Sequence, residues 1–198
     1  MSTLISITGA SGTGKTSLVQ ALAKTGKFQT AYEQHTGRPF QALFKQDKRY
    51  ALANQMDYFL LRAEQEKELR AALQIGLTDG GLDLDFHGFT RLFHRRGLLG
   101  DPEFDLCRRL YNFIRATLPP PELIVRLNAD VGTVAGRLST RDRINIASAE
   151  DTTLFNSYLD EWLATIPSDQ VLTLDVSNEP ATYLKSTSLI LEYVERLF

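Results

Sequence analysis

The stretch of sequence that decides the fold is Gly9-Ala10-Ser11-Gly12-Thr13-Gly14-Lys15-Thr16. It matches the pattern G-x-x-x-x-G-K-[ST], comes directly after the apolar run 4–8, and precedes a helical pattern that begins near Lys15. The glycines let such a loop curl so that its backbone N–H groups point inward at an anion, and the positive end of the next helix adds to the field. We therefore expect all eight residues to bind the phosphates of a nucleoside triphosphate, with Lys15 near the β- and γ-phosphates and the Thr16 hydroxyl on Mg²⁺.

Short strand-like runs alternate with longer helical patterns on both sides of this loop, which is typical of a parallel sheet with helices on both faces. The predicted strands are 4–8, 28–32, 75–78, 123–127 and 171–176. The predicted helices after the first are about 47–74, 101–118, 131–138, 150–164 and 181–196. The chain is therefore predicted to be α/β, a single three-layer α/β/α domain over residues 1–198 with a five-stranded parallel sheet.

Composition excludes several classes of partner. The 198 residues are 43% apolar and 23% charged, and 22 basic against 24 acidic residues give a net charge of −2. A nearly neutral chain has no general attraction to nucleic acid or to a membrane surface, and no apolar run is long enough to span a bilayer. Cys107 is the single cysteine, and no basic-then-apolar leader precedes the first strand, so we expect a cytoplasmic protein with a small-molecule partner.

The segment after the fourth strand narrows the class of reaction. No Asn-Lys-x-Asp segment occurs, which disfavours a GTPase, and the chain is small for a motor or transporter ATPase. Arg137, Arg141 and Arg143 are spaced so that at least two can converge on one phosphate, where guanidinium groups stabilise a transferring phosphoryl group. This pattern favours a compact P-loop kinase with an arginine-bearing lid over about 137–150.

Short markers lie beyond the P-loop along almost the whole chain. They are Glu33, Arg38-Pro39-Phe40, Lys48-Arg49-Tyr50, Gln55, Phe59-Leu60, Arg62, Asp79, Asp85, Phe89, the three lid arginines and the segment 172–176. In order and spacing the chain resembles the deoxynucleoside kinases, within the thymidylate-kinase-like group of P-loop kinases. The resemblance implies an ATP- and Mg²⁺-dependent transfer of a phosphoryl group to the 5′-hydroxyl of a (deoxy)nucleoside, in a protein that is often a homodimer formed through helices.

The resemblance also implies roles for individual residues. Glu33 corresponds to the general base that accepts the proton of the attacking hydroxyl, a role that its place after the second strand permits. Lys15 and the lid arginines correspond to the groups on the phosphates. Asp79, at the end of the third strand, is placed to hold Mg²⁺ together with Thr16.

The substrate side is implied in the same way. Gln55 and Asp85 correspond to the residues that bind the edge of the nucleobase, and Phe89 to an aromatic residue that stacks on it. Helical periodicity alone allows Gln55 to lie on an exposed face, and a phenylalanine at the spacing of Phe89 is often plain core. Phe44 stands where the family carries a tyrosine that binds the 3′-hydroxyl of the sugar, so we assign it to the substrate site as well.

Three positions depart from the family pattern. Gly80 replaces an arginine that contacts the phosphoryl group, Phe44 lacks a hydroxyl, and Ile146 replaces a lid glutamate. The loss of both partners of one hydroxyl weakens recognition of an ordinary deoxyribose, and the loss of a cation weakens catalysis unless Arg38, Arg91 or a lid arginine takes its place. Two alternatives therefore stay open, a related P-loop kinase that acts on a nucleoside monophosphate or another small alcohol, and a catalytically impaired ATP-binding sensor or partner-binding module.

Overall fold

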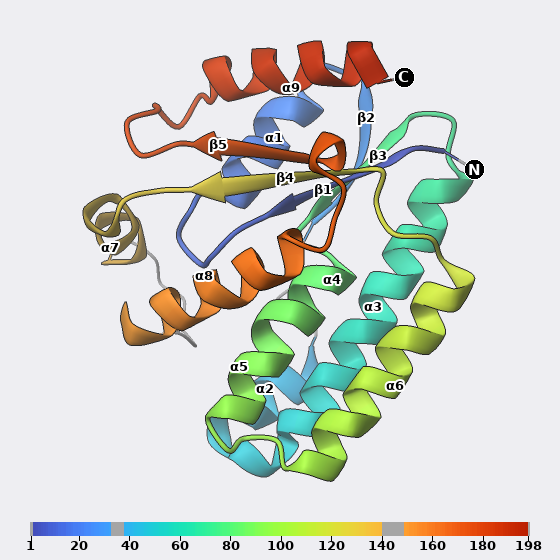
Figure 1. The fold of residues 1–198 in the computed structure, drawn as a ribbon, viewed down its shortest axis with the longest axis vertical. Helices are drawn as coiled ribbons and strands as arrows, with labels where there is room; N and C mark the ends of the chain where they lie inside the picture. The colour runs from blue at the N-terminus through green and yellow to red at the C-terminus, as the bar shows by residue number, and fades with distance from the viewer. Residues whose placement is uncertain (1, 33–37, 140–148, 198) are drawn as a thin grey trace.

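The computed structural model describes residues 2–32, 38–139 and 149–197 of the chain. Five parallel strands form one sheet in the order β2-β3-β1-β4-β5 (Figure 1). The strands are β1 (Leu4–Thr8), β2 (Phe28–Ala31), β3 (Ile75–Asp79), β4 (Leu123–Asn128) and β5 (Val171–Asp175). β1 is central, with Ile7 opposite Asp79 of β3 and Val125 of β4. Since all strands run the same way, their carboxyl ends meet at one edge of the sheet, where ligands of open α/β sheets bind.

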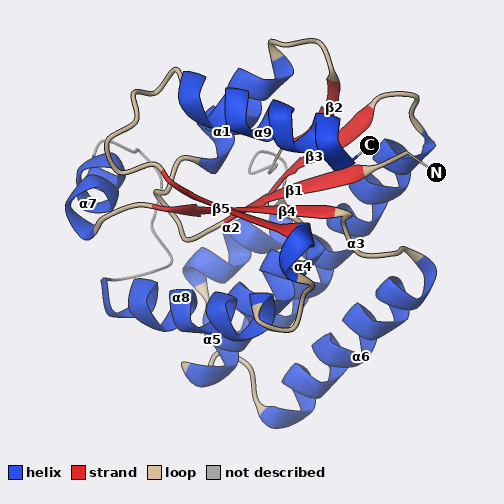
Figure 2. Ribbon diagram, turned by 45° about the horizontal axis from the view of Figure 1, so that its top comes forward, coloured by secondary structure: helices blue, strands red, loops and turns tan. Residues whose placement is uncertain are grey.

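Helices cover both faces of the sheet, as Figure 2 shows. On one face lie α1 (Lys15–Ala23) and α9 (Leu184–Leu197), which contact each other. The other face carries α3 (Ala51–Ala71), α4 (Leu82–Leu84), the π-helix η2 (Asp85–Thr90), α5 (Arg91–Arg95) and α8 (Ala149–Leu163). Farther from the sheet lie α2 (Pro39–Gln46) and α6 (Asp101–Thr117), and α7 (Val131–Ser139) lies beside the carboxyl edge (Figure 1). The predicted three-layer α/β/α fold with a five-stranded parallel sheet is confirmed.

The inner strands are mostly apolar on both sides because both sides are buried. In β4, Leu123, Val125 and Leu127 pack in the core under α1 and α9, whereas Ile124 packs with Leu159 of α8 on the opposite face. Side chains of a strand alternate between faces, so consecutive buried apolar residues such as 123–125 require helices on both faces. A further apolar core lies among α2, α3, α5 and α6 and contains Cys107. None of the described helices is both long and apolar enough to cross a bilayer.

The helix predicted over 47–74 is shorter in the structure and is preceded by a separate 3-10 turn. Asp47 accepts a hydrogen bond from the backbone N–H of Arg49 at 3.0 Å, which begins the 3-10 turn η1 (Lys48–Tyr50), and α3 then runs from 51 to 71. The proline-started α2 and the helical segment 82–95 were not predicted as helices. For α2, Pro39 at its start and the i, i+3, i+4 spacing of Phe40, Leu43 and Phe44 are local helix signals. The pieces of 82–95 have three to six residues and are too short to show a helical period, so packing determines them.

Candidate active site

The P-loop joins β1 to α1 and forms a closed cradle. Gly14 is the N-cap of α1 with φ +101°, and a Cβ there would lie 1.9 Å from the Tyr183 Oη, so the position requires glycine. The ammonium of Lys15 donates to the carbonyl oxygens of Gly9 at 2.9 Å and Ala10 at 3.0 Å. The side chain of Lys15 therefore lies across the loop, whose backbone N–H groups are predicted to bind the phosphates together with it.

Thr16 and Asp79, the two predicted metal ligands, are in direct contact. The Thr16 hydroxyl donates to Asp79 Oδ2 at 2.6 Å. Asp79 is 1% exposed, and its other oxygen, Oδ1, is buried without a hydrogen-bond partner among the residues that the structure describes. A buried carboxylate oxygen without a partner is costly in an apolar interior, and Mg²⁺ prefers oxygen ligands. The residues present therefore fit a magnesium ion.

A chain of buried polar side chains lies on the other side of β3. Arg62 of α3 donates from Nε to Asp85 Oδ2 at 2.9 Å and from Nη1 to Gln65 Oε1 at 3.1 Å. Gln65 in turn donates to the backbone oxygen of Tyr32, just beyond β2, at 2.8 Å. Gln55 lies on the same helix, is 3% exposed, and donates to the Thr90 hydroxyl at 2.6 Å. Both predicted base-edge residues, Gln55 and Asp85, are thus buried and held in place.

The backbone conformation at position 80 favours glycine, apart from the missing arginine of the family pattern. Its φ of +83° is a left-handed conformation that favours glycine, and a Cβ there would lie 3.2 Å from Arg62 Nη2. The guanidinium next to this position is therefore that of Arg62. Arg38, one suggested replacement for the missing cation, instead pairs with Asp57 Oδ1 at 2.9 Å.

The two predicted aromatic residues have different surroundings. Phe44 is buried in the core of α2, α3, α5 and α6, with its ring centroid 5.2 Å from that of Phe93. Phe89 is only half-buried and packs at 4.8 Å and 60° against Phe155. Phe89 lies on the same π-helix as Asp85, an element that is frequent at functional sites.

Arg137 is the one predicted lid arginine that the structure describes. It lies near the end of α7 and donates to the backbone oxygens of Thr13 in the P-loop at 2.9 Å and of Val176 at 3.1 Å. It therefore joins α7 to the P-loop and to the end of β5. The described residues do not include four other positions singled out from the sequence, namely Glu33, Arg141, Arg143 and Ile146.

A buried ionic cluster supports the segment between β3 and η2. Arg115 of α6 binds Glu66 with two nitrogens, at 2.7 and 2.9 Å, and binds both oxygens of Asp83 at 2.8 Å. Tyr111 also donates to Asp83 at 2.8 Å. Burial opposes the charge of Arg115, but the two carboxylates raise its pKa above the usual range. Asp83 is two residues from Asp85, so the cluster fixes the turn that carries the predicted base-edge carboxylate.

His87 extends this cluster toward α8. Its Nε2 is 3.2 Å from the Tyr111 hydroxyl, and its ring stacks on Trp162 with centroids 5.0 Å apart and planes within 5°. Burial lowers the pKa of His87 to about 4, against the opposite effect of the Asp83 charge. The imidazole is therefore neutral at pH 7 and acts as a packing group.

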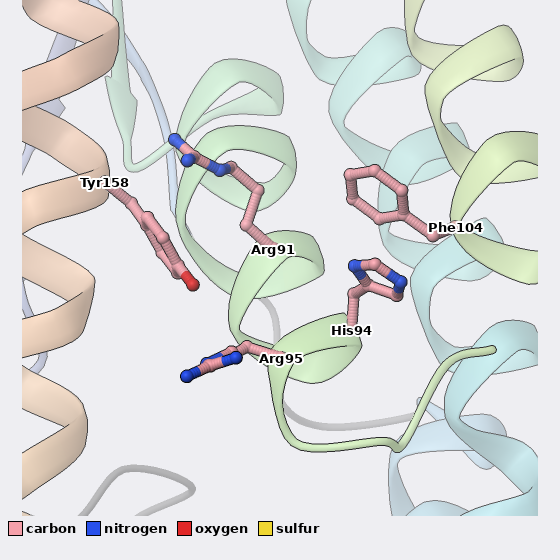
Figure 3. Close-up of a pocket in the computed structure, with 5 residues that line it drawn as sticks. All are labelled: Arg91, His94, Arg95, Phe104 and Tyr158. Atoms are coloured by element: carbon pink, nitrogen blue, oxygen red, sulfur yellow. The ribbon is translucent and has the colours of Figure 1, made fainter. Parts of the chain in front are cut away.

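A shallow pocket of about 290 Å³ lies between α5, α6 and α8. It is lined by Arg91, His94, Arg95, Phe104 and Tyr158 (Figure 3). Arg91 lies 4.0 Å over the Tyr158 ring and pairs with Glu161 at 2.5 Å. Because Arg91 is engaged with α8, it is not the cation beside Gly80.

Sequence reasoning missed the roles of three residues at the site. Arg62 was recognised only as a family marker, although it lies seven residues after Gln55 and hence on the same face of α3. Nothing in the sequence pattern indicated that Thr90 bonds with Gln55 or that Tyr183 closes against Gly14. Both contacts join segments far apart in sequence, and only packing brings them together.

Comparisons with known proteins show the family of the chain. A family model described as deoxynucleoside kinase matches residues 5–197. The deoxyadenosine kinase of Dictyostelium discoideum is 26% identical over 142 residues, which are 71% of this chain and 58% of that protein. The deoxyadenosine/deoxycytidine kinase of Bacillus subtilis (strain 168) is 26% identical over 146 residues, 71% of this chain and 66% of that protein. The matches thus span less than two thirds of these curated relatives.

Solved structures share the fold over the whole chain. The deoxyadenosine kinase from M. mycoides with bound dCTP has a TM-score of 0.79 and 18% identity, covering 98% of this chain and all of its own. The same kinase with bound dATP has a TM-score of 0.76, covering 97% and 99%. At this identity the likeness shows a common fold.

Proposed function

Because the chain belongs to the deoxynucleoside kinase family, we propose that it transfers the γ-phosphoryl group of ATP to the 5′-hydroxyl of a deoxynucleoside. One observation carries the proposal: residues assigned to the phosphates and residues assigned to the nucleobase lie next to each other at the end of β3. Asp79 bonds with Thr16 of the P-loop, and the next residue, Gly80, lies against Arg62, which pairs with Asp85. A nucleotide and a nucleoside bound on the two sides of β3 would meet at this point.

In the proposed reaction the P-loop N–H groups and Lys15 bind the donor phosphates. Arg137, which already contacts the P-loop, stabilises charge on the transferring group together with Arg141 and Arg143. Thr16 and Asp79 hold Mg²⁺, which when bound neutralises charge on the phosphate oxygens. Glu33 accepts the proton of the attacking hydroxyl as general base.

The proposed substrates are deoxyadenosine and deoxycytidine, whose bases carry an amino donor beside a ring-nitrogen acceptor. Support comes from the relatives, which are named for deoxyadenosine and for deoxyadenosine and deoxycytidine. Gln55 and Asp85 are buried polar groups of the kind that bind the edge of a base, and Phe89 offers a partly exposed ring for stacking. Phe44 has no hydroxyl for the sugar, so we expect weak discrimination at the 3′ position.

The test measures ADP release with ATP and Mg²⁺ over deoxyadenosine, deoxycytidine, deoxyguanosine and thymidine. We expect nucleoside-dependent turnover, and a loss of about 100-fold or more in kcat for Glu33→Gln with ATP binding retained. Glu68→Gln, an exposed carboxylate on α3, is the matched control and should behave like wild type. No nucleoside-dependent ADP release, or full activity of Glu33→Gln, would refute the proposal.

Gly80 motivates two alternatives, because it has no side chain to supply the cation of the family pattern. A kinase for nucleoside monophosphates or other small alcohols would release ADP only when those acceptors are added to the same assay. An ATP-binding sensor would show thermal stabilisation by ATP without turnover on any acceptor. A single productive acceptor rejects the sensor.

We also propose a homodimer through α3 and α6, which contact each other along their length (Figure 1). Leu106 and Phe113 lie seven residues apart on one face of α6 and are 42% and 69% exposed, and Leu60 of α3 is 55% exposed. Large exposed apolar side chains of this kind mark interaction surfaces. Phe113→Glu should convert a dimer to a monomer in light scattering, whereas Leu189→Glu on α9 should not. A monomeric wild type contradicts the proposal.

A further inference from the structure

Thr90 joins the two residues assigned to the base edge. Its side chain is fully buried, and its hydroxyl oxygen accepts a hydrogen bond from Gln55 Nε2 at 2.6 Å. The same hydroxyl donates to the backbone oxygen of Asp85 at 2.9 Å, across the π-helix that begins with Asp85 and ends with Thr90. One side chain therefore contacts both Gln55 and the backbone of Asp85.

This double contact determines which way the Gln55 amide faces. A hydroxyl group has one proton, and here a carbonyl oxygen, which cannot donate, receives it. Toward Gln55 the Thr90 oxygen acts only as an acceptor, so the amide must present its NH₂ group. A flipped amide would turn Oε1 toward Thr90, and the hydroxyl could donate to it only by giving up its hydrogen bond to the Asp85 carbonyl oxygen, so the flip costs a buried hydrogen bond.

A fixed amide offers a ligand one donor and one acceptor in a set order. None of the described residues donates to Gln55 Oε1, and the second N–H of Nε2 is not used by Thr90. Adenine and cytosine carry an amino donor beside a ring-nitrogen acceptor, whereas guanine and thymine carry a carbonyl acceptor beside a ring N–H. In one binding pose, the two classes need opposite orientations of the same amide.

We propose that Thr90 is a specificity-determining positioning residue, which holds the Gln55 amide in the orientation that pairs with the amino donor and ring nitrogen of adenine or cytosine and not with the carbonyl and ring N–H of guanine or thymine. The inference rests on the proposed function, because it takes adenine and cytosine as the preferred bases from there. Thr90 is fully buried and does not contact the base, so it would influence discrimination between bases only through Gln55.

The test compares Thr90→Val, which keeps the shape and removes the hydroxyl, with Thr90→Ser, which keeps the hydroxyl. The measured quantity is the ratio of kcat/KM for deoxyadenosine and deoxycytidine to kcat/KM for deoxyguanosine and thymidine. We expect this ratio to fall by at least about 10-fold in Thr90→Val and to stay near wild type in Thr90→Ser, with KM for ATP unchanged in both. A purely structural role would lower kcat/KM for all nucleosides equally and leave the ratio unchanged, which overturns the inference.

A second measurement serves if Thr90→Val does not fold. In wild-type protein, the side-chain amide protons of Gln55 should give a strong nuclear Overhauser effect to the Thr90 methyl group with and without deoxyadenosine. Absence of that effect means that Oε1 faces Thr90 and overturns the inference. Wild type without activity on any nucleoside overturns the proposed function itself, whereas an active wild type whose Thr90→Val variant keeps its preference overturns only the role of Thr90.

Discussion

Replacing Arg115 by methionine should lower the free energy of unfolding by about 3 to 5 kcal/mol, because it leaves two buried carboxylates without their cation. Four N–H···O contacts between 2.7 and 2.9 Å are lost, two to Glu66 and two to Asp83. Methionine fills much of the aliphatic volume of arginine, so packing contributes little to the loss. For a domain with a total stability of about 5 to 15 kcal/mol, this is a large fraction.

The assay is urea denaturation at pH 7.5, monitored by the fluorescence of Trp162, the single tryptophan, which is buried against His87. The triple variant Arg115→Met, Glu66→Gln, Asp83→Asn has no buried charge left at this place and should regain more than half of the loss.

A loss smaller than about 1 kcal/mol for Arg115→Met would refute the reasoning, since that is the size of an exposed ion pair. A triple variant that is no more stable than Arg115→Met would refute it as well, because the cost would then not come from uncompensated charge. Arg115→Lys separates charge from geometry. An ammonium has three N–H groups and lacks the planar fork with which Arg115 makes four contacts to the two carboxylates, so lysine should restore only part of the loss.

Three further predictions concern other parts of the fold. Gly80→Ala should lower the free energy of unfolding in urea more than Gly26→Ala does. Both glycines have a positive φ, which costs a residue with a Cβ about 1 to 2 kcal/mol, but of the two only Gly80 has neighbouring atoms, those of Arg62 among them, within 4 Å of a new Cβ. Equal losses in the two variants would contradict this reasoning. Stability should fall as the pH drops from 6.5 to 4, because unfolded His87 takes up a proton that the buried ring, with its pKa of about 4, does not; His87→Phe should flatten this part of the pH profile, and an unchanged slope would count against it. Cys107 is fully buried, and burial raises its pKa to about 12, so it should react with a thiol reagent at pH 8 only in urea; rapid labelling of the folded protein would contradict its placement.

The strands and the P-loop were predictable because their signals are local. The three inner strands, β1, β3 and β4, are largely apolar runs buried on both sides, and the glycines of the P-loop match a pattern that depends on neighbouring residues only. The segment 82–95 was not predicted as helical. Its three pieces, α4, η2 and α5, are short, and the ionic cluster around Asp83 and the packing of Phe86 hold them in place.

At the candidate site, the sequence indicates which residues are involved but not how they are arranged. The P-loop pattern predicts a phosphate side with Lys15 and Thr16, the strand end predicts a metal role for Asp79, and the resemblance to the family implies base-edge roles for Gln55 and Asp85. The order of residues does not tell whether Gln55 is exposed or buried, because helical periodicity permits either. Folding settles that question by packing α3 against η2.

The sequence by itself determined the fold class, the phosphate-binding loop and the family, since each of these depends on spacing along the chain. Only the tertiary structure decided which guanidinium lies beside Gly80. Arg62 comes from α3, whereas Arg38 and Arg91 are held by Asp57 and Glu161. Such a choice depends on distances between segments that are far apart in sequence, and burial makes it specific because an unpaired charge in the interior is too costly to tolerate.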